Sequence, residues 1–347
     1  MDIKEFDYPL DRSLIAQEPI EPRDHSRLLI LNRKTQEISH HYFYEITNYL
    51  SDNDVLVLNN SQVLPARLLG KKEKNNKPAE ILLIRPENQP FFDAQIWPAR
   101  WLAIGGPKLK KGDIINFNNE LSLIIKEKLN YQLVVEFNQK DQKLKEIIYQ
   151  LGEMPLPPYI KNPTEKSFLN YQTVYAQELG SIAAPTAGFH FTSQLIEEIN
   201  KKGVAIEFIT LHVGLGTFLP IKSQKVENHQ MEREYFRISP ETASRLNQAK
   251  DKGKRIIAVG TTVTRVLETI SHEGKITGQE NWTELFIYPG YQFKFIDALI
   301  TNFHLPQSTP LLLVSAFAGK NLIFKAYQEA QEKKYRFYSF GDAMFII

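Results

Sequence analysis

The spacing of apolar and polar residues divides the chain into segments with two different patterns. Between residues 61 and 152, short apolar runs are separated by turn-forming Gly, Pro and Asn residues. This pattern predicts closely spaced antiparallel strands in a small barrel or sandwich. On either side, strand and helix patterns alternate, which predicts α/β layering with a largely parallel sheet. We therefore expect a discontinuous α/β domain, residues 1–60 and 153–347, interrupted by an inserted antiparallel β-barrel domain at residues 61–152.

The individual elements follow from the length of each apolar run and from the residues that flank it. Strands are expected at Arg27–Asn32, Asp54–Leu58, Ala79–Ile84, Phe91–Trp97, Asp113–Phe117, Leu121–Lys126, Tyr131–Phe137, Val204–Thr210, Arg255–Gly260, Asp297–Thr301 and Leu311–Ala316. Helices are expected at Tyr42–Leu50, Asp141–Leu151, Thr192–Lys202, Pro240–Lys252, Thr261–Ile270 and Asn321–Lys333.

The stretch Tyr171–Thr192 has an unusual composition. After Glu178 the chain runs 18 residues without Asp, Glu, Lys or Arg. Pro185 and Gly188 argue against a helix here, and small residues let the backbone come close to a ligand. His190 supplies a group that titrates near neutral pH. The composition therefore predicts the wall of an active site.

Three other loops next to predicted strands carry groups suited to ligand binding. His212 begins a Gly-Leu-Gly loop, but the third glycine and the following helix of a dinucleotide-binding motif are missing. His304 lies in a loop that also contains Asn302. The Gly260-Thr261-Thr262 turn either binds a carboxylate or phosphate at a helix N-terminus or simply caps that helix.

Near the start of the chain, Arg23 and Asp24 directly precede the first predicted strand. Arg23 either clamps a carboxylate or phosphate or pairs with Asp24.

Composition excludes several classes of protein. The chain has no cysteine, which rules out disulfides, thiol nucleophiles and Cys-ligated metals and is consistent with a reducing cytosol. No metal-ligand spacing, P-loop or serine-hydrolase motif is present, so we expect no metal. The longest uncharged run, Ala298–Gly319, contains Asn302, His304 and two prolines, so we expect no membrane span.

The net charge of +2 conceals an uneven distribution. Residues 61–150 carry 15 Lys and Arg against 10 Asp and Glu, whereas the rest carries 27 against 30. Basic charge is thus concentrated in one segment, as a nucleic-acid contact requires, although a solvated surface would also explain it.

Several long motifs of this chain resemble one family, the S-adenosylmethionine:tRNA ribosyltransferase-isomerases of queuosine biosynthesis. The resemblance runs in order from Phe6 to Ile347, and the chain departs from the usual pattern at Gln62, Glu232 and Val263. The motifs include RDHSRLL (23–29), VLNNSQVLPARLLGKK (57–72), MPLPPYI (154–160), AAPTAGFHFT (183–192), LITNFHLPQSTPLLLVSAFAG (299–319) and YRFYSFGDAMFI (335–346).

The resemblance implies a reaction. The ribosyl unit of S-adenosylmethionine passes to 7-aminomethyl-7-deazaguanine at the wobble position of tRNA and isomerises, giving epoxyqueuosine, adenine and methionine. S-adenosylmethionine is then a co-substrate, no other cofactor is expected, and the macromolecular partner is tRNA. We expect a cytoplasmic monomer. The rival hypotheses are a tRNA methyltransferase that uses the same donor and a non-catalytic RNA-binding protein.

Site residues follow from these motifs. His190, His212 and His304 are the candidate bases, because a sulfonium acidifies the adjacent ribose C5′ protons. The expected substrate-binding residues are Arg23, Asp24, Tyr175, Thr186, Gly188, Phe189, Gly214, Gly216, Thr217, Gly260, Thr261, Thr262 and Asn302. The expected tRNA contacts are Lys71, Lys72, Lys110 and Lys111.

Overall fold

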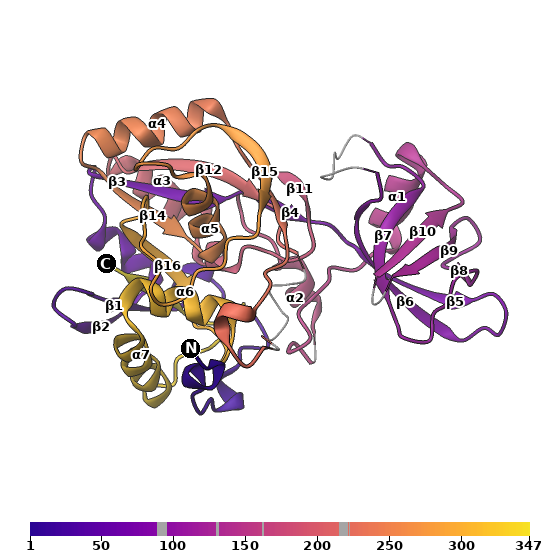
Figure 1. The fold of residues 1–347 in the computed structure, drawn as a ribbon, viewed down its shortest axis with the longest axis horizontal. Helices are drawn as coiled ribbons and strands as arrows, with labels where there is room; N and C mark the ends of the chain where they lie inside the picture. Colours follow the sequence, from indigo (N-terminus) through magenta and orange to yellow (C-terminus); the bar gives the residue numbers. More distant parts are fainter. Residues whose placement is uncertain (89–95, 130–131, 162, 215–220, 222) are drawn as a thin grey trace. The chain divides into compact units, whose positions relative to one another are not determined.

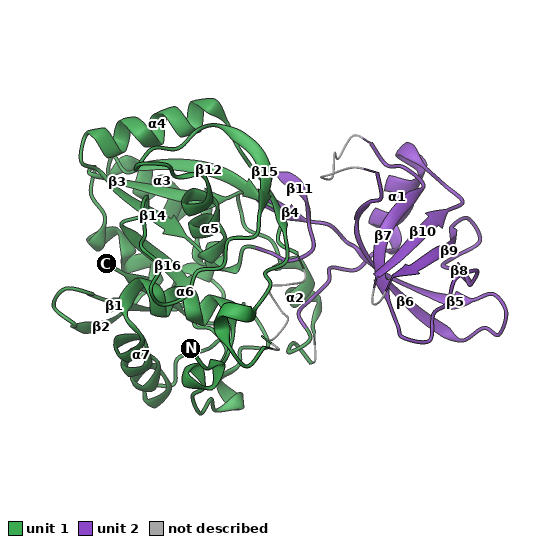
Figure 2. Cartoon of the chain, viewed as in Figure 1, with its two compact units in different colours: residues 1–60, 158–176, 185–347 green, residues 61–157, 177–184 purple. Residues whose placement is uncertain are grey.

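A computed structural model describes residues 1–347 except 89–95, 130–131, 162, 215–220 and 222. The chain forms two compact units (Figure 2). Unit 1 contains residues 1–60, 158–176 and 185–347, and unit 2 contains residues 61–157 and 177–184.

Unit 1 is built around a mixed sheet (Figure 1). Nine strands are hydrogen-bonded within the described ranges, in the order β15-β13-β12-β3-β14-β16-β17-β1-β2. The four neighbours β12, β3, β14 and β16 are parallel, β17 turns back antiparallel to β16, and β1 is parallel to β17. The largely parallel sheet expected from the sequence therefore corresponds to the four neighbouring strands β12, β3, β14 and β16. The strands are β1 (Arg27–Leu31), β2 (Ile38–Tyr42), β3 (Asp54–Asn59), β12 (Ala205–Leu211), β13 (Glu234–Ile238), β14 (Arg255–Val259), β15 (Gln279–Thr283), β16 (Ala298–Asn302) and β17 (Ala343–Ile346).

Helices cover both faces of this sheet. The strand residues that point to one face, such as Leu56 and Ile257, form a buried cluster with side chains of η4, η5 and α3. Helices α4 and α5 contact the same strands without contributing to that cluster, which places them on the other face. The helices are η1 (Ile3–Phe6), η2 (Arg12–Leu14), η3 (Arg23–His25), η4 (Phe43–Tyr49), α2 (Glu165–Leu169), η5 (Thr186–His190), α3 (Ser193–Lys201), η7 (Val226–Asn228), α4 (Pro240–Asp251), α5 (Thr261–Ile270), α6 (Thr309–Ala318) and α7 (Lys320–Glu332).

Local sequence signals explain where helices begin and end. Thr192 caps α3, its hydroxyl accepting the backbone N–H of Leu195 at 3.1 Å, and Gly203 follows the helix at φ +81°. Ser239 caps α4 in the same way, with Pro240 in the first turn.

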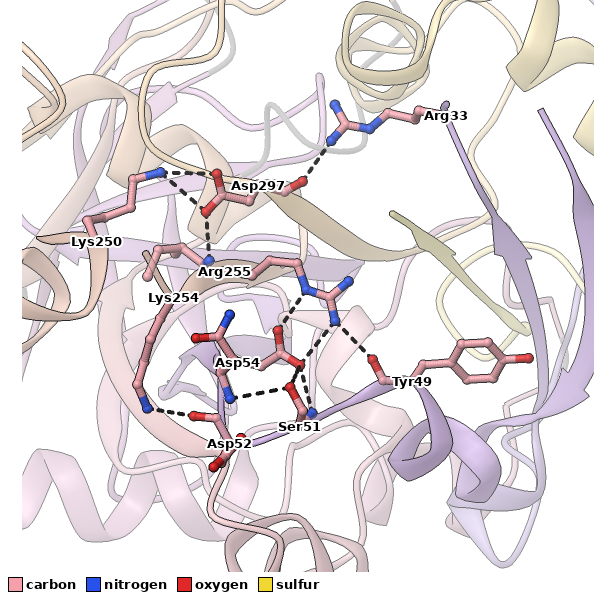
Figure 3. A network of polar contacts seen from close by, with 11 residues as sticks. Arg33, Tyr49, Ser51, Asp52, Asp54, Lys250, Lys254, Arg255 and Asp297 are labelled. Atoms are coloured by element: carbon pink, nitrogen blue, oxygen red, sulfur yellow. Dashed lines mark hydrogen bonds and ion pairs between the residues drawn. The ribbon is translucent and has the colours of Figure 1, made fainter. Parts of the chain in front are cut away.

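Charged side chains tie together the amino ends of the central strands (Figure 3). Asp54, which begins β3, accepts two hydrogen bonds from the guanidinium of Arg255, which begins β14, at 2.7 and 3.1 Å. Asp297, directly before β16, accepts the Ile256 N–H at 2.8 Å and pairs with Lys250 at 3.1 Å. This network joins the central parallel strands at the end of the sheet where they begin. The opposite end, where these strands finish, is not part of it.

Unit 2 is a closed barrel with the strand order β10-β7-β6-β5-β8-β9 in its described part. Trp97 and Trp101, both nearly inaccessible, pack in its core, and α1 adds Leu144 and Ile148. A short parallel pair, β4 and β11, also belongs to this unit. The elements are β4 (Ser61–Val63), β5 (Arg67–Lys72), β6 (Pro78–Pro86), β7 (Arg100–Gly105), β8 (Ile114–Asn116), β9 (Ser122–Leu129), β10 (Gln132–Phe137), α1 (Asp141–Leu151) and β11 (Glu178–Ser181).

One predicted element is wrong. Leu311–Ala316 is not a strand but the middle of helix α6, which Ser308 caps through its hydroxyl and which carries Pro310 in its first turn. Its place beside β16 is taken by β17. The helix expected near Tyr42–Leu50 is present as the 3₁₀ helix η4 (Phe43–Tyr49), which directly follows β2. The predicted strand Phe91–Trp97 lies largely outside the described residues.

No helix within the described ranges combines the length and the apolar character needed to cross a membrane.

Candidate functional site

Strand order brings three distant segments to one edge of the sheet in unit 1. The register places Asn302, the last residue of β16, opposite Ala343, and Ala343 opposite Leu28. Because β1 runs antiparallel to β16, the turn η3 that precedes β1 lies beside the end of β16. Helix η5, which carries His190, contacts both β16 and η3.

A pocket opens at this edge, which we name the Arg23 pocket. Arg23 comes from η3, His190 and Phe189 come from η5, and Phe340 comes from the segment before β17. The pocket is lined by Pro19, Ile20, Arg23, Ser26, Asn170, Phe189, His190, Ser339, Phe340 and Gly341.

His190 is held on three sides in the wall of the Arg23 pocket. Its Nδ1 lies 2.7 Å from the Ser26 hydroxyl and its Nε2 lies 3.1 Å from the Asn302 side-chain amide. The amide oxygen of Asn302 in turn accepts the Thr186 hydroxyl at 2.9 Å. The ring of Phe43 stacks on the imidazole at 5.0 Å. The imidazole therefore has a fixed position.

The surroundings keep His190 neutral. The side chain is 3% exposed. Burial lowers its pKa from the usual 6.5 to about 3, and the nearby positive charges of Arg336 and Arg23 act in the same direction.

Arg23 presents a positive charge to the pocket. Its guanidinium donates to the carbonyl oxygens of Gln172 at 2.6 Å and Asn170 at 3.3 Å, and to the Asn170 side-chain oxygen at 2.8 Å. It also lies 5.7 Å from the centre of the Phe189 ring. Phe189 stacks on Phe340, so an aromatic wall stands next to the cation.

Three other predicted residues support this site from outside it. Asp24 accepts the hydroxyl of Thr192 at 2.8 Å and so assists the cap of α3. Gly188 lies against Tyr175, and a Cβ at this position would come within 2.0 Å of the Tyr175 hydroxyl. Glycine is therefore required for η5 to pack here.

His212 occupies a different part of the same edge. It follows β12, which two strands separate from β16. Its ring stacks on Tyr235, and burial lowers its pKa to about 4. The following Gly214 donates its N–H to Glu234 at 2.8 Å, and Glu234 pairs with Arg265 of α5 in the interior. Gly216 and Thr217, two predicted substrate contacts, lie outside the described residues.

His304 packs away from His190, although it follows Asn302 closely in sequence. Its Nε2 lies 2.9 Å from the Thr301 hydroxyl, and its backbone bonds to the hydroxyls of Tyr8 and Tyr327. Burial lowers its pKa to about 3. The structure thus places the three predicted histidines in three separate environments.

The Gly260-Thr261-Thr262 turn begins α5 without a side-chain cap. Gly260 is the N-cap residue at φ +96° and has no side chain with which to cap the helix. Thr262 instead lies 3.5 Å from the amide of Asn59.

The predicted tRNA-contacting lysines gather on unit 2. Lys71, Lys110 and Lys111 are exposed and have no ion pair within the described part of the chain. Lys72 differs, because its ammonium pairs with Asp113 at 2.6 Å and donates to the Lys108 carbonyl at 2.9 Å. These two contacts join β5 to the loop that carries Lys110 and Lys111.

Sequence reasoning missed seven of the ten residues that line the Arg23 pocket, including Ser26, Asn170 and Phe340, and also the nearby Arg336. Ser26 lies in the RDHSRLL motif, but nothing in the motif shows that it meets His190. Asn170 and Phe340 come from segments to which no function was assigned. Arg336 affects the site through its charge.

Among the described residues, no group of three or more His, Asp or Glu side chains is arranged to hold a metal ion.

The low pKa values of these histidines predict a pH-dependent stability. As the pH falls below 6.5, the unfolded chain binds protons at His190, His212 and His304, whereas the folded chain does not until pH 3–4. The free energy of unfolding should therefore be highest above pH 6.5 and fall below it, by about 1.4 kcal/mol per pH unit from His190 alone. Urea unfolding of the wild type and of His190→Gln between pH 7 and 5 checks this. A difference between the two proteins that does not change with pH would contradict it.

Comparison with known proteins supports one family. Residues 3–346 match the family described as queuosine biosynthesis protein. The crystal structure of S-adenosylmethionine tRNA ribosyltransferase from Thermotoga maritima is similar, with 38% sequence identity and a TM-score of 0.56. The match covers 99% of this chain and 100% of that one. The chain therefore belongs to the family of queuosine biosynthesis proteins.

Proposed function

We propose that this protein is an S-adenosylmethionine:tRNA ribosyltransferase-isomerase. It transfers the ribosyl unit of S-adenosylmethionine to 7-aminomethyl-7-deazaguanine at the wobble position of tRNA and releases adenine and methionine. The observation that carries the proposal is full-length similarity, at 38% identity, to the Thermotoga maritima S-adenosylmethionine tRNA ribosyltransferase. The family match over residues 3–346 supports it independently. Because both substrates are cytosolic, we place the activity in the cytoplasm, and we propose that the protein acts as a monomer.

The proposed reaction matches the chemistry of the Arg23 pocket. The donor is a sulfonium cation that carries one carboxylate, and the pocket combines an arginine with the aromatic rings of Phe189 and Phe340. Aromatic faces attract cations, and Arg23 suits a carboxylate. Among the described residues, no Asp or Glu lines this pocket. We therefore assign the binding of S-adenosylmethionine to unit 1 and the contact with tRNA to unit 2.

Proton transfer is part of the overall reaction. The donor loses its sulfonium charge when methionine leaves, and the acceptor amine gains a carbon substituent, so one proton is released per turnover. We propose His190, His212 and His304 as the candidate residues for accepting this proton or for positioning the substrates. Of these three, His190 lines the Arg23 pocket.

The exposed lysines of unit 2 should contact tRNA phosphates. Replacing Lys71, Lys110 and Lys111 together by glutamine should weaken tRNA binding and reduce the slope of log K against log salt by about 2. Filter binding between 50 and 250 mM salt measures this slope. Lys126→Gln and Lys143→Gln are matched controls, because their charges already pair with Glu136 and Glu120. An unchanged slope in the triple variant would exclude these contacts.

The small-molecule products distinguish this function from the rival hypotheses. Purified protein, S-adenosylmethionine and tRNA that bears the precursor base should release adenine and methionine in equal amounts, as measured by chromatography. S-adenosylhomocysteine would indicate a methyltransferase. Binding of tRNA with no consumption of the donor would indicate a non-catalytic RNA-binding protein.

A further inference from the structure

We propose that the Arg23 pocket is a carboxylate receptor that holds the methionyl end of the donor. Arg23 and Ser26 are its two hydrogen-bond donors. Thr186, Asn302 and His190 are positioning residues that direct the Ser26 hydroxyl proton into the pocket. The inference rests on the proposed function, because that function makes S-adenosylmethionine the ligand.

The direction of the hydrogen bonds follows from the chemistry of each group. The amide nitrogen of Asn302 faces His190 Nε2 at 3.1 Å, while its amide oxygen accepts the Thr186 hydroxyl at 2.9 Å. An amide nitrogen donates and does not accept, so Nε2 accepts. A neutral imidazole carries a single N–H, which must then be at Nδ1 and donate to Ser26 at 2.7 Å.

This arrangement leaves the Ser26 proton for a ligand. The oxygen of Ser26 already accepts from His190, and its hydroxyl has no other bonded partner in the described structure. Ser26 lines the pocket and is 1% exposed. A buried hydroxyl proton without an acceptor is costly, so an acceptor atom in the pocket would satisfy it.

The surroundings of His190 support the neutral state that this direction requires. The ring stacks on Phe43 and is 3% exposed, and two arginines lie near enough to oppose a positive charge. A protonated imidazole would also turn Nε2 into a donor that faces the amide nitrogen of Asn302. The neutral form therefore fits both the burial and the hydrogen bonds.

Arg23 adds a positive charge beside Ser26, and the Glu21 carboxylate acts on it only through space. Its hydrogen bonds go to neutral oxygen atoms of Asn170 and Gln172, and no carboxylate of the described chain forms an ion pair with it. The nearby Glu21 carboxylate instead accepts the side-chain amide of Asn170 at 3.0 Å. A guanidinium and a hydroxyl proton that line one pocket suit the two oxygens of a carboxylate.

The donor matches this pocket better than the other substrate does. The methionyl carboxylate is the anionic group of S-adenosylmethionine, and the methylene groups and the sulfonium next to it suit the rings of Phe189 and Phe340. The acceptor base carries a cationic aminomethyl group and no carboxylate, so it has no anionic group for Arg23 to bind. A tRNA phosphate also has anionic oxygens, but the depth of Ser26 and His190 disfavours a backbone group.

The affinities of the wild-type protein for two related compounds test the proposed carboxylate receptor without any substitution. S-adenosylmethionine should bind about tenfold to a hundredfold more tightly than decarboxylated S-adenosylmethionine in isothermal titration calorimetry, because a charge-assisted pair is lost. Equal affinity for the two compounds would overturn the inference and leave the proposed function standing. Failure to bind either compound would remove both the proposed function and this inference.

Two variants test whether Arg23 and Ser26 cause the preference for S-adenosylmethionine over its decarboxylated form. Arg23→Met and Ser26→Ala should each bring the two affinities closer together, mainly by weakening binding of S-adenosylmethionine. Arg233→Met is the matched control, because Arg233 is exposed and lies outside the pocket, and it should keep the wild-type preference. Equal weakening for both compounds, or a higher KM for tRNA with an unchanged donor affinity, would place the carboxylate elsewhere.

Asn302→Asp tests the direction of the hydrogen bonds. The carboxylate can only accept at neutral pH, so His190 should move its proton to Nε2 and Ser26 should donate to Nδ1. The preference for the carboxylated donor should then fall at least tenfold. Nitrogen NMR of labelled histidine should show the N–H of His190 at Nδ1 in the wild type and at Nε2 in the variant. An N–H at Nε2 in the wild type would contradict the proposed direction.

Discussion

Replacing His190 by alanine is expected to lower kcat/KM for the donor by about 100-fold or more. The change removes the ring that stacks on Phe43 and leaves Ser26 and Asn302 without their partner. Displacement of a positioned group by about 1 Å can cost 100-fold in rate. The two unpaired buried groups should also lower the free energy of unfolding by roughly 2–4 kcal/mol. Steady-state kinetics on protein shown to be folded by circular dichroism measures the effect.

Two further variants show whether the rate depends on the position of the His190 imidazole. His190→Gln keeps a polar side chain but cannot reach both Ser26 and Asn302 with imidazole geometry, so it should retain an intermediate rate. His40→Gln is the control, because His40 also makes two hydrogen bonds, to Tyr335 and Glu329, but lies outside the Arg23 pocket. It should turn over at the wild-type rate. A His190→Ala variant with the wild-type kcat/KM would exclude a role for this residue.

Replacing Arg265 by methionine is expected to cost about 3–5 kcal/mol of unfolding free energy. Arg265 pairs with Glu234 in the interior of unit 1, with side chains 9% and 4% exposed. Loss of the guanidinium leaves a buried carboxylate without its cation, which is the costly way to break such a pair. Because Glu234 also accepts the N–H of Gly214 at 2.8 Å, the glycine loop after β12 should loosen as well. Urea unfolding provides the measurement.

The double variant Arg265→Met with Glu234→Met separates charge from packing. Removal of both charges should recover about half of the loss, because no unpaired charge remains buried. Recovery should be partial, since the Gly214 N–H and the carbonyl oxygens of Thr283 and Leu285 lose their partners. A double variant that is less stable than Arg265→Met would show that the buried charge is not the cause.

Local signals in the sequence were sufficient for much of the fold. Helix α3 begins after its Thr192 cap and ends before Gly203 as expected, and Thr261–Ile270 forms α5. The apolar run Leu311–Ala316 was mistaken for a strand, because a fully buried helix and a fully buried strand have the same composition. The signals that decide between them are the Ser308 cap and Pro310, both of which favour a helix start.

The site depends on sheet order, which local patterns do not reveal. Arg23, Thr186, Phe189 and Asn302 were expected to bind a ligand, and the structure brings them around His190. Ser26 was not expected, because its contact with His190 depends on the sheet order in which β16, β17 and β1 are neighbours.

The three histidine loops looked alike in sequence but lie apart. His212 follows β12 and His304 follows β16, and two strands stand between them. The His304 imidazole bonds to the Thr301 hydroxyl and its backbone bonds to Tyr8 and Tyr327, and His304 does not line the Arg23 pocket. Adjacency to a strand end therefore placed both residues at the same end of the parallel strands but did not predict that their surroundings differ.

Mass spectrometry of the tRNA nucleosides tests the central claim most directly. Transfer RNA that bears 7-aminomethyl-7-deazaguanine at the wobble position is incubated with the protein and S-adenosylmethionine, then digested. We predict that the precursor nucleoside disappears and an epoxyqueuosine nucleoside replaces it, and that omission of the donor abolishes the change. An unchanged precursor nucleoside, with folded protein and intact donor, would contradict the account.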